Sequence, residues 1–178
     1  MLDMTDPLFP EFQNRWRVTE VKHPGVIWAR YADAITLPVL QDVFGGTWPP
    51  LECRSGERVF AVRNPLLPAR PFDPLDHPAA WLSLTINQFD PECVFMSRGV
   101  WPNEHGKGLG KFMRRWAEVW CKQNGIKLLT IWINASNKEH LDKVKADTFW
   151  SMSAIDFEPL AFRFEHAIEA MAESHEIT

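Results

Sequence analysis

The 178-residue sequence has few cysteines and no long apolar run. Its three cysteines are an odd number and contain no Cys-x-x-Cys pair, which argues against a disulfide framework or a zinc site built on paired thiolates. The opening residues, MLDMTDPLFPEF, lack the basic and apolar regions of a secretion signal. No apolar run approaches the ~18 residues needed to span a bilayer. We therefore predict a cytoplasmic protein with no membrane association and free, mostly buried thiols.

The sequence also lacks an excess of positive charge. Its formal net charge is −4, whereas proteins that hold nucleic acid through phosphate contacts usually carry a basic face. Nonspecific nucleic-acid binding is therefore not expected, although recognition of a single base or terminus stays open. The six histidines are dispersed without ligand spacing, so we predict no metal site.

Aromatic residues are abundant but unevenly distributed, with nine Trp and twelve Phe against a single tyrosine, Tyr31. Tryptophan buries a large area and usually needs a partner for its N–H group. The excess predicts either a thick core or a wide apolar groove, and the sequence leaves both open.

Periodicity of apolar residues predicts one domain over residues 1–178, with an irregular segment at 1–13. We expect a mixed α/β (α+β) fold in which helices flank a mostly antiparallel central sheet. Segment 26–29 is either a short strand or the start of a helix. Expected strands are 16–21, 58–63, 81–86, 93–100, 127–133, 150–155 and 160–164, and expected helices are 37–44, 108–124, 136–148 and a short one from about 165.

Residues 64–80 form a proline-rich segment, because Pro65, Pro68, Pro71, Pro74 and Pro78 recur at short intervals. Proline lacks a backbone N–H group, so this spacing disfavours a sheet interior and favours an extended loop. A surface connection and a lid over a binding site are equally compatible with it.

The segment VWPNEHGKGLG, residues 100–110, carries the chemistry. Three glycines open the helix of clearest amphipathic pattern, which follows an apolar strand. Free N–H groups at a helix start, the positive end of the helix dipole and the absence of Cβ atoms together suit a phosphate group. A Walker A loop does not fit, and a dinucleotide fingerprint starting at Gly106 would need glycine where Lys111 stands.

This segment resembles the acyl-coenzyme A loop of the GNAT N-acetyltransferases, Val-x-Pro-x-x-[Arg/Gln]-Gly-x-Gly-[Ile/Leu]-Gly. The matching residues are Val100, Pro102, Gly106, Gly108, Leu109 and Gly110, with His105 in place of Arg or Gln. A second family pattern, Asn-x-x-Ala, then Tyr, then Gly-Phe, matches at Asn137 and Phe149. It departs at His140, Val144 and Thr148.

The resemblance implies a sheet that splays open beside the strand ending at Val100, with the pantetheine arm paired to that strand's backbone. It implies acetyl-coenzyme A as acyl donor and transfer of its acetyl group to an amine on a small molecule, a protein or a nucleobase. Alternatives are a non-catalytic coenzyme A-binding module and a different group transfer at the same site. A homodimer is compatible with it. The implied cofactor-binding residues are Arg98, Gly99, Val100, His105, Gly106, Lys107, Gly108, Leu109, Gly110, Lys111 and Asn137.

The resemblance leaves catalysis less defined. Val144 stands where relatives commonly place the Tyr that protonates the leaving thiolate, so water or Ser97 would have to supply that proton. Relatives often place a Glu base on the strand before the loop. Glu92 is the nearest candidate, with Asp90 as its competitor, and both residues could equally well just end a turn.

Overall fold

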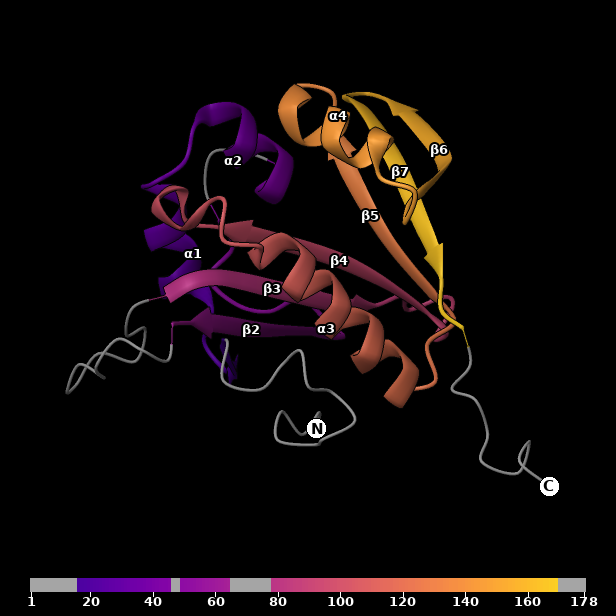
Figure 1. Cartoon of the computed structure of the whole chain (residues 1–178), viewed down its shortest axis with the longest axis horizontal. Coiled ribbons are helices and arrows are strands. Elements are labelled where there is room, and N and C mark those ends of the chain that lie inside the picture. Colours follow the sequence, from indigo (N-terminus) through magenta and orange to yellow (C-terminus); the bar gives the residue numbers. More distant parts are fainter. Residues whose placement is uncertain (1–15, 46–48, 65–77, 170–178) are drawn as a thin grey trace.

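A computed structural model describes residues 16–45, 49–64 and 78–169. Seven strands form one sheet in the order β1-β2-β3-β4-β5-β7-β6 (Figure 1). All neighbouring strands are antiparallel except β4 and β5, so the mixed, mostly antiparallel sheet predicted from the sequence is confirmed. The strands are β1 Arg17–Val21, β2 Glu57–Arg63, β3 Pro78–Ile86, β4 Cys93–Val100, β5 Leu128–Asn134, β6 Ser151–Phe157 and β7 Leu160–Ala167.

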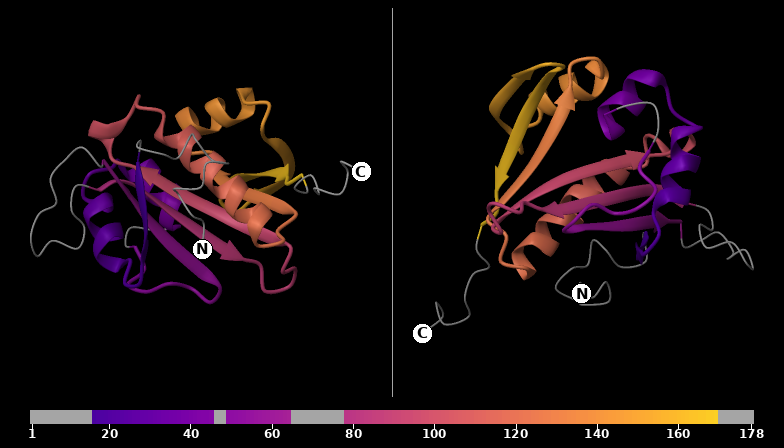
Figure 2. Two further views of the ribbon diagram at one scale, coloured as in Figure 1. Left: turned by 60° about the horizontal axis from the view of Figure 1, so that its bottom comes forward. Right: turned by 180° about the vertical axis from the view of Figure 1, so that it is seen from behind.

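Helices cover both faces of the sheet (Figures 1 and 2). They are α1 Gly25–Ala32, α2 Leu37–Phe44, α3 Leu109–Gln123 and α4 Lys138–Ala146, with a short 3-10 turn, η2, at Pro102–Glu104. The apolar stripe of α3 packs with α4 and one sheet face into the larger core, which includes Met113, Trp116, Leu141 and Val144. On the other face, α1 packs Ile27, Trp28 and Tyr31 against Val59 and Trp81. Tryptophans therefore contribute to both cores, which accounts for much of their excess.

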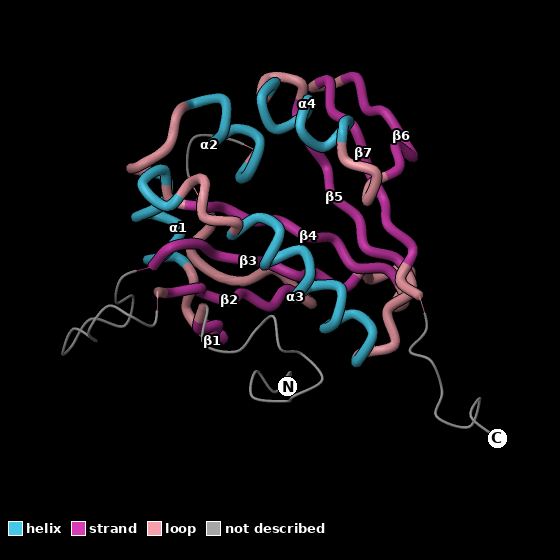
Figure 3. Tube along the Cα trace, viewed as in Figure 1, coloured by secondary structure: helices cyan, strands magenta, loops and turns pink. Residues whose placement is uncertain are grey.

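The parallel contact between β4 and β5 is short. It pairs Cys93 with Leu128, Val94 with Leu129 and Phe95 with Thr130, and then stops, although both strands continue. Beyond Phe95 the two strands diverge as a V, with α2 near its open end (Figures 1 and 3). The predicted splaying beside β4 is therefore present.

Most predicted elements match the observed ones to within a few residues, and segment 26–29 belongs to helix α1. Two expectations were wrong. The predicted helix from about Glu165 is strand as far as Ala167, because these residues continue the antiparallel ladder with β5. Residues 78–80, predicted as the end of the proline-rich loop, belong to β3, and Pro78 is its first residue, where a missing N–H group is tolerated. Residues 1–13 and 65–77 lie outside the described residues.

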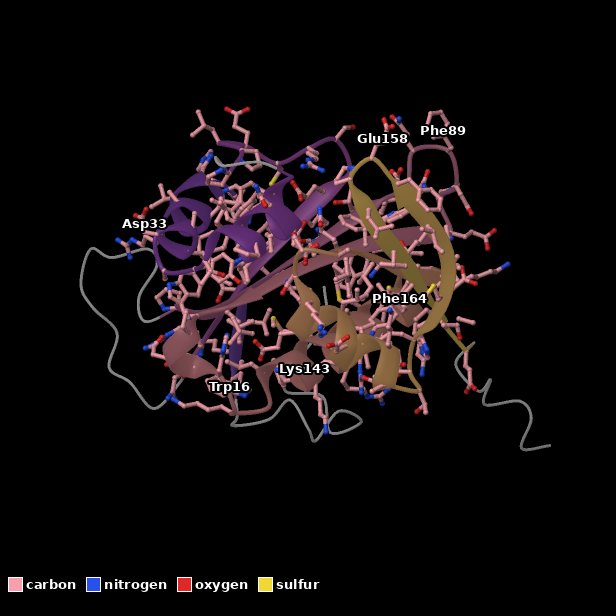
Figure 4. The ribbon with its side chains drawn as sticks, turned by 90° about the horizontal axis from the view of Figure 1, so that it is seen from above. Trp16, Asp33, Phe89, Lys143, Glu158 and Phe164 are labelled. Atoms are coloured by element: carbon pink, nitrogen blue, oxygen red, sulfur yellow. The ribbon has the colours of Figure 1, made fainter. Side chains whose placement is uncertain are left out.

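Side chains of the same type differ in burial (Figure 4). Phe164 of β7 lies inside the core, whereas Phe89 lies at the periphery in the turn between β3 and β4. Cys93 and Cys121 are buried and Cys53 is partly exposed, and none of the three forms a disulfide. Within the described ranges, no helix is long and apolar enough to cross a membrane.

Gly99 on β4 permits the close packing of α1. A Cβ atom added there would lie 2.4 Å from Trp81 Nε1 and 2.5 Å from Tyr31 Cζ. Gly99→Ala should therefore destabilise the fold by about 1–3 kcal/mol, the usual range for overpacking. Gly110→Ala is the matched control, because its nearest neighbour would be Arg98 at 4.0 Å and alanine favours the helix. Chemical denaturation midpoints of both variants measure the difference, and equal stabilities would contradict the packing argument.

Candidate functional site

The loop between β4 and α3 has the backbone of an anion cradle. Gly106 and Gly108 adopt φ of +79° and +78°, a left-handed conformation that other residues rarely adopt. The first hydrogen bond of α3 runs from Phe112 N–H to Gly108 O at 3.0 Å. The N–H groups of Leu109, Gly110 and Lys111 therefore have no acceptor within the helix. A Cβ atom added at Gly106 or Gly108 would meet nothing within 4 Å, so the space over the loop is open.

The loop side chains differ in what they can offer. His105 Nε2 lies 3.1 Å from Val100 O, so this nitrogen carries the proton and the ring is turned back onto β4. Lys107 is paired with Glu104 at 2.7 Å and is not a free charge. Leu109 is buried and offers its backbone alone, whereas Lys111 is exposed on the first turn of α3.

Beyond Phe95, the edge of β4 that faces the V has backbone N–H and C=O groups that are not paired with β5. Trp101 N–H donates to Ala79 O, and Asn87 N–H donates to Cys93 O, so odd-numbered residues of this strand face β3. Strand alternation then turns the N–H and C=O groups of Met96, Arg98 and Val100 toward the opening. Gly99, also predicted to bind the cofactor, directs its backbone groups the other way.

Arg98 supplies a positive charge under the start of α3. Its Nη1 donates to Gly110 O at 2.7 Å. Burial lowers the pKa of this guanidinium to about 10, and nearby Arg114 adds to the decrease. Arg98 is therefore still charged at neutral pH. Arg114 is neutralised by Asp147, while no carboxylate within salt-bridge distance of Arg98 is found in the described part of the chain.

Asp42 of α2, which the sequence did not single out, joins this helix to the β5 arm of the V. Its buried carboxylate accepts from Asn134 N–H at the end of β5 and from Asn137 Nδ2 at 2.9 Å, before α4. His140 lies 3.9 Å away. Asn137, predicted to contact the cofactor, thus has its side-chain amide engaged within the protein.

The two predicted catalytic residues lie at different depths of the V. Glu92 stands at its closed end, where its carboxylate pairs with Lys127 at 2.8 Å and is about half exposed. Its competitor Asp90 caps the adjoining turn by accepting from Glu92 N–H. Ser97 lies on β4 beyond the last β5 pair and lines a pocket on the α1–α2 face. Val144, at the position of the missing Tyr, is buried in the larger core.

Comparison with known proteins identifies the architecture. No family model and no curated protein matches the sequence. Among solved structures, spermidine N-acetyltransferase from Vibrio cholerae, in complex with CoA and spermine, superposes with a TM-score of 0.64 at 9% identity. That match covers 88% of this chain and 97% of that one.

Two further structures give the same result. The GNAT domain of S. lividans PAT has a TM-score of 0.63 at 12% identity over 85% of this chain and 90% of its own. The ribosomal-protein-S18-alanine N-acetyltransferase from Escherichia coli has a TM-score of 0.61 at 12% identity over 89% and 97%. This chain has the GNAT fold. The resemblance first seen in the loop at residues 100–110 therefore extends to the whole described architecture.

Tyr31, the single tyrosine of the chain, lies against Gly99 of β4 in the structure. Burial, and then the charge of Asp42, raise its pKa to about 12, while a hydrogen bond with the Val100 backbone opposes the increase. The phenol is therefore neutral at any physiological pH.

Since Tyr31 is the chain's single tyrosine, phenolate absorbance in the ultraviolet reports it alone. We expect the pH titration of this absorbance to have its midpoint near 12 in the folded protein and at about 10 in denaturant. Because the unfolded chain loses this proton first, the stability contributed by Tyr31 is complete below pH ~10 and falls as the pH rises toward 12. A midpoint near 10, with circular dichroism showing an intact fold, would contradict the buried placement.

Proposed function

We propose that this protein is an N-acetyltransferase that moves an acetyl group from acetyl-coenzyme A to an amine. The observation that carries the proposal is the junction of a glycine cradle at the start of α3 with an unpaired β4 edge. Coenzyme A carries phosphate groups, which the helix start suits, and an extended arm with amide groups, which an unpaired strand edge suits. The GNAT fold shared with the acetyltransferases described above supports the assignment.

The residues suit the cofactor in two ways. The N–H groups from Gly106 to Lys111 and the guanidinium of Arg98 would hold a pyrophosphate at the start of α3. The backbone of Met96 and Arg98 would pair with the amides of the pantetheine arm as a further strand would. At Val100, His105 already engages the carbonyl, so Val100 is less available than the sequence suggested. When bound, the thioester supplies the activated acetyl group.

The predicted roles of Glu92 and Ser97 stay proposals, with unequal support. Ser97 borders the opened edge of β4, whereas Glu92 is held by Lys127 at the closed end. A non-catalytic coenzyme A-binding module, or a different group transfer, stays the second candidate because Val144 occupies the acid's position inside the core.

Self-association is a further proposal. Strand β6 lies at the edge of the sheet and exposes Met152, Ile155 and Phe157. Apolar side chains on a free edge strand favour pairing with a second copy. Sedimentation should therefore give a dimer for the full chain and a smaller species for Phe157→Glu. A monomeric wild type would contradict this proposal.

Coenzyme A should stabilise the protein against heat. At a ligand concentration of about 100 times Kd, binding contributes roughly 2.7 kcal/mol. For a domain of this length the increase in Tm is about 5–10 °C. Differential scanning fluorimetry with coenzyme A and acetyl-coenzyme A measures it, and an unchanged Tm at millimolar ligand would rule out the proposed cofactor.

Gly108→Glu should abolish this stabilisation, because the side chain would occupy the cradle and add negative charge to it. Gly125→Glu is the matched control: Gly125 follows the other end of α3, has φ of +70° and also has open space at its Cβ position. Both variants carry the same backbone cost, on the order of 1 kcal/mol. Only Gly108→Glu should lose the response to coenzyme A, and a retained response would place the phosphate elsewhere.

A further inference from the structure

A small, open pocket with room for about one water-sized group lies on the sheet face covered by α1 and α2, away from α3. Strands β2, β3 and β4 form its floor with Glu57, Ser83 and Ser97, and the aromatic side chains of Trp28, Phe44 and Trp81 form walls. The floor ends at β4, whose other edge is the unpaired one described above. The pocket therefore adjoins the proposed acetyl donor from the side.

The walls are a cluster of packed rings. Phe44 stacks on Trp81 with centroids 5.8 Å apart, and Trp28 meets Trp81 edge-on at 6.0 Å. Phe95 lines the same pocket. Aromatic faces attract organic cations and bury apolar bodies, so such walls suit a cation carried on an apolar group.

Glu57 is the one carboxylate among the residues lining the pocket. Its Oε1 accepts from Arg54 N–H at 2.9 Å, and its Oε2 accepts from Ser83 Oγ at 2.5 Å. Each oxygen keeps a further lone pair for a ligand. Ser83 stands directly opposite Ser97 in the ladder, where Cβ atoms lie about 4.5–5.5 Å apart. A row of polar groups thus runs from Glu57 to the β4 edge.

We propose that this pocket receives the amino group of the acceptor, a primary amine on an aromatic or compact apolar body, with Glu57 binding the ammonium group and the neighbouring rings contacting the body. This inference rests on the proposed acetyl transfer. One carboxylate can neutralise one ammonium, and Arg54, which also lines the pocket, repels a second. The pocket therefore selects monoamines over polyamines, unlike the spermidine enzyme of similar fold.

Glu57 is also the proposed general base that removes a proton from the ammonium group. The carboxylate takes one proton from the ammonium group, which leaves a neutral amine. The amine nitrogen then bonds to the acetyl carbon as the carbon–sulfur bond breaks, and the second proton goes from nitrogen to the leaving sulfur. The products are the acetamide and free coenzyme A, and Glu57 returns its proton to water. Ser83 is a positioning residue because it holds the Glu57 carboxylate.

The test compares amines and variants in the full-length protein by thiol release. Phenethylamine should be acetylated with a kcat/KM at least tenfold above that of spermidine. Glu57→Gln should lower kcat/KM for phenethylamine by about 10²-fold, the usual scale for a lost general base. Glu52→Gln is the matched control, because Glu52 is exposed and lies outside the pocket. Both variants should keep the coenzyme A-dependent increase in Tm.

Three results would overturn the inference. A preference for spermidine or peptides would show that the pocket is not the acceptor site. A loss of rate in Glu92→Gln with a normal rate in Glu57→Gln would return the role of base to Glu92. Absence of thiol release with arylalkylamines, while coenzyme A still raises Tm, would overturn the acceptor class but not cofactor binding.

A second measurement is independent of the cofactor. Calorimetry should detect phenethylamine binding to the wild type and to Glu52→Gln but not to Glu57→Gln. Binding that survives Glu57→Gln would contradict the role of the carboxylate even if the protein proves to have no coenzyme A site.

Discussion

The loss of pairing between β4 and β5 after Phe95 is the constraint on which the rest of the structure depends. An interrupted ladder leaves backbone N–H and C=O groups that need other partners, since burying them unpaired is costly. The protein meets this need at both ends of the opening. His105 engages Val100 O beside the loop, and Asp42 of α2 accepts from the end of β5. The groups between these points, on Met96 and Arg98, stay available to a ligand.

The two faces of the sheet are packed differently. On one face, α3 and α4 bury a continuous apolar core, which gives the loop at Gly106–Gly110 a rigid support. The other face holds a smaller aromatic core under α1 and α2, and part of it opens as a pocket with a carboxylate in its floor. The proposed phosphate site thus lies on the better packed face, and the proposed acceptor site lies on the face with the smaller aromatic core.

Departures from the family pattern become understandable in three dimensions. His105 lacks the fixed charge of the usual Arg, but Arg98 places a guanidinium under the same helix start. Val144 faces the core, where a tyrosine would fit only if the core repacked. Tyr31 reaches the β4 edge from α1, and its raised pKa limits it to the neutral form. A search for substitutes among residues near 105 and 144 in the sequence would therefore miss Arg98 and Tyr31.

The sequence by itself predicted helices α2, α3 and α4, most strands and the glycine loop before α3. Apolar periodicity in residues 109–120 is local, and Gly106 and Gly108 record a backbone conformation that few other residues tolerate. It misassigned Glu165–Ala167, because their strand character comes from pairing with β5 rather than from their own pattern. Only the tertiary structure brought Glu57, Ser83 and Ser97 into one row, or Asp42 across to Asn137. Such contacts join residues 14–95 positions apart through strand register and helix packing, and no local pattern in a single chain encodes that register.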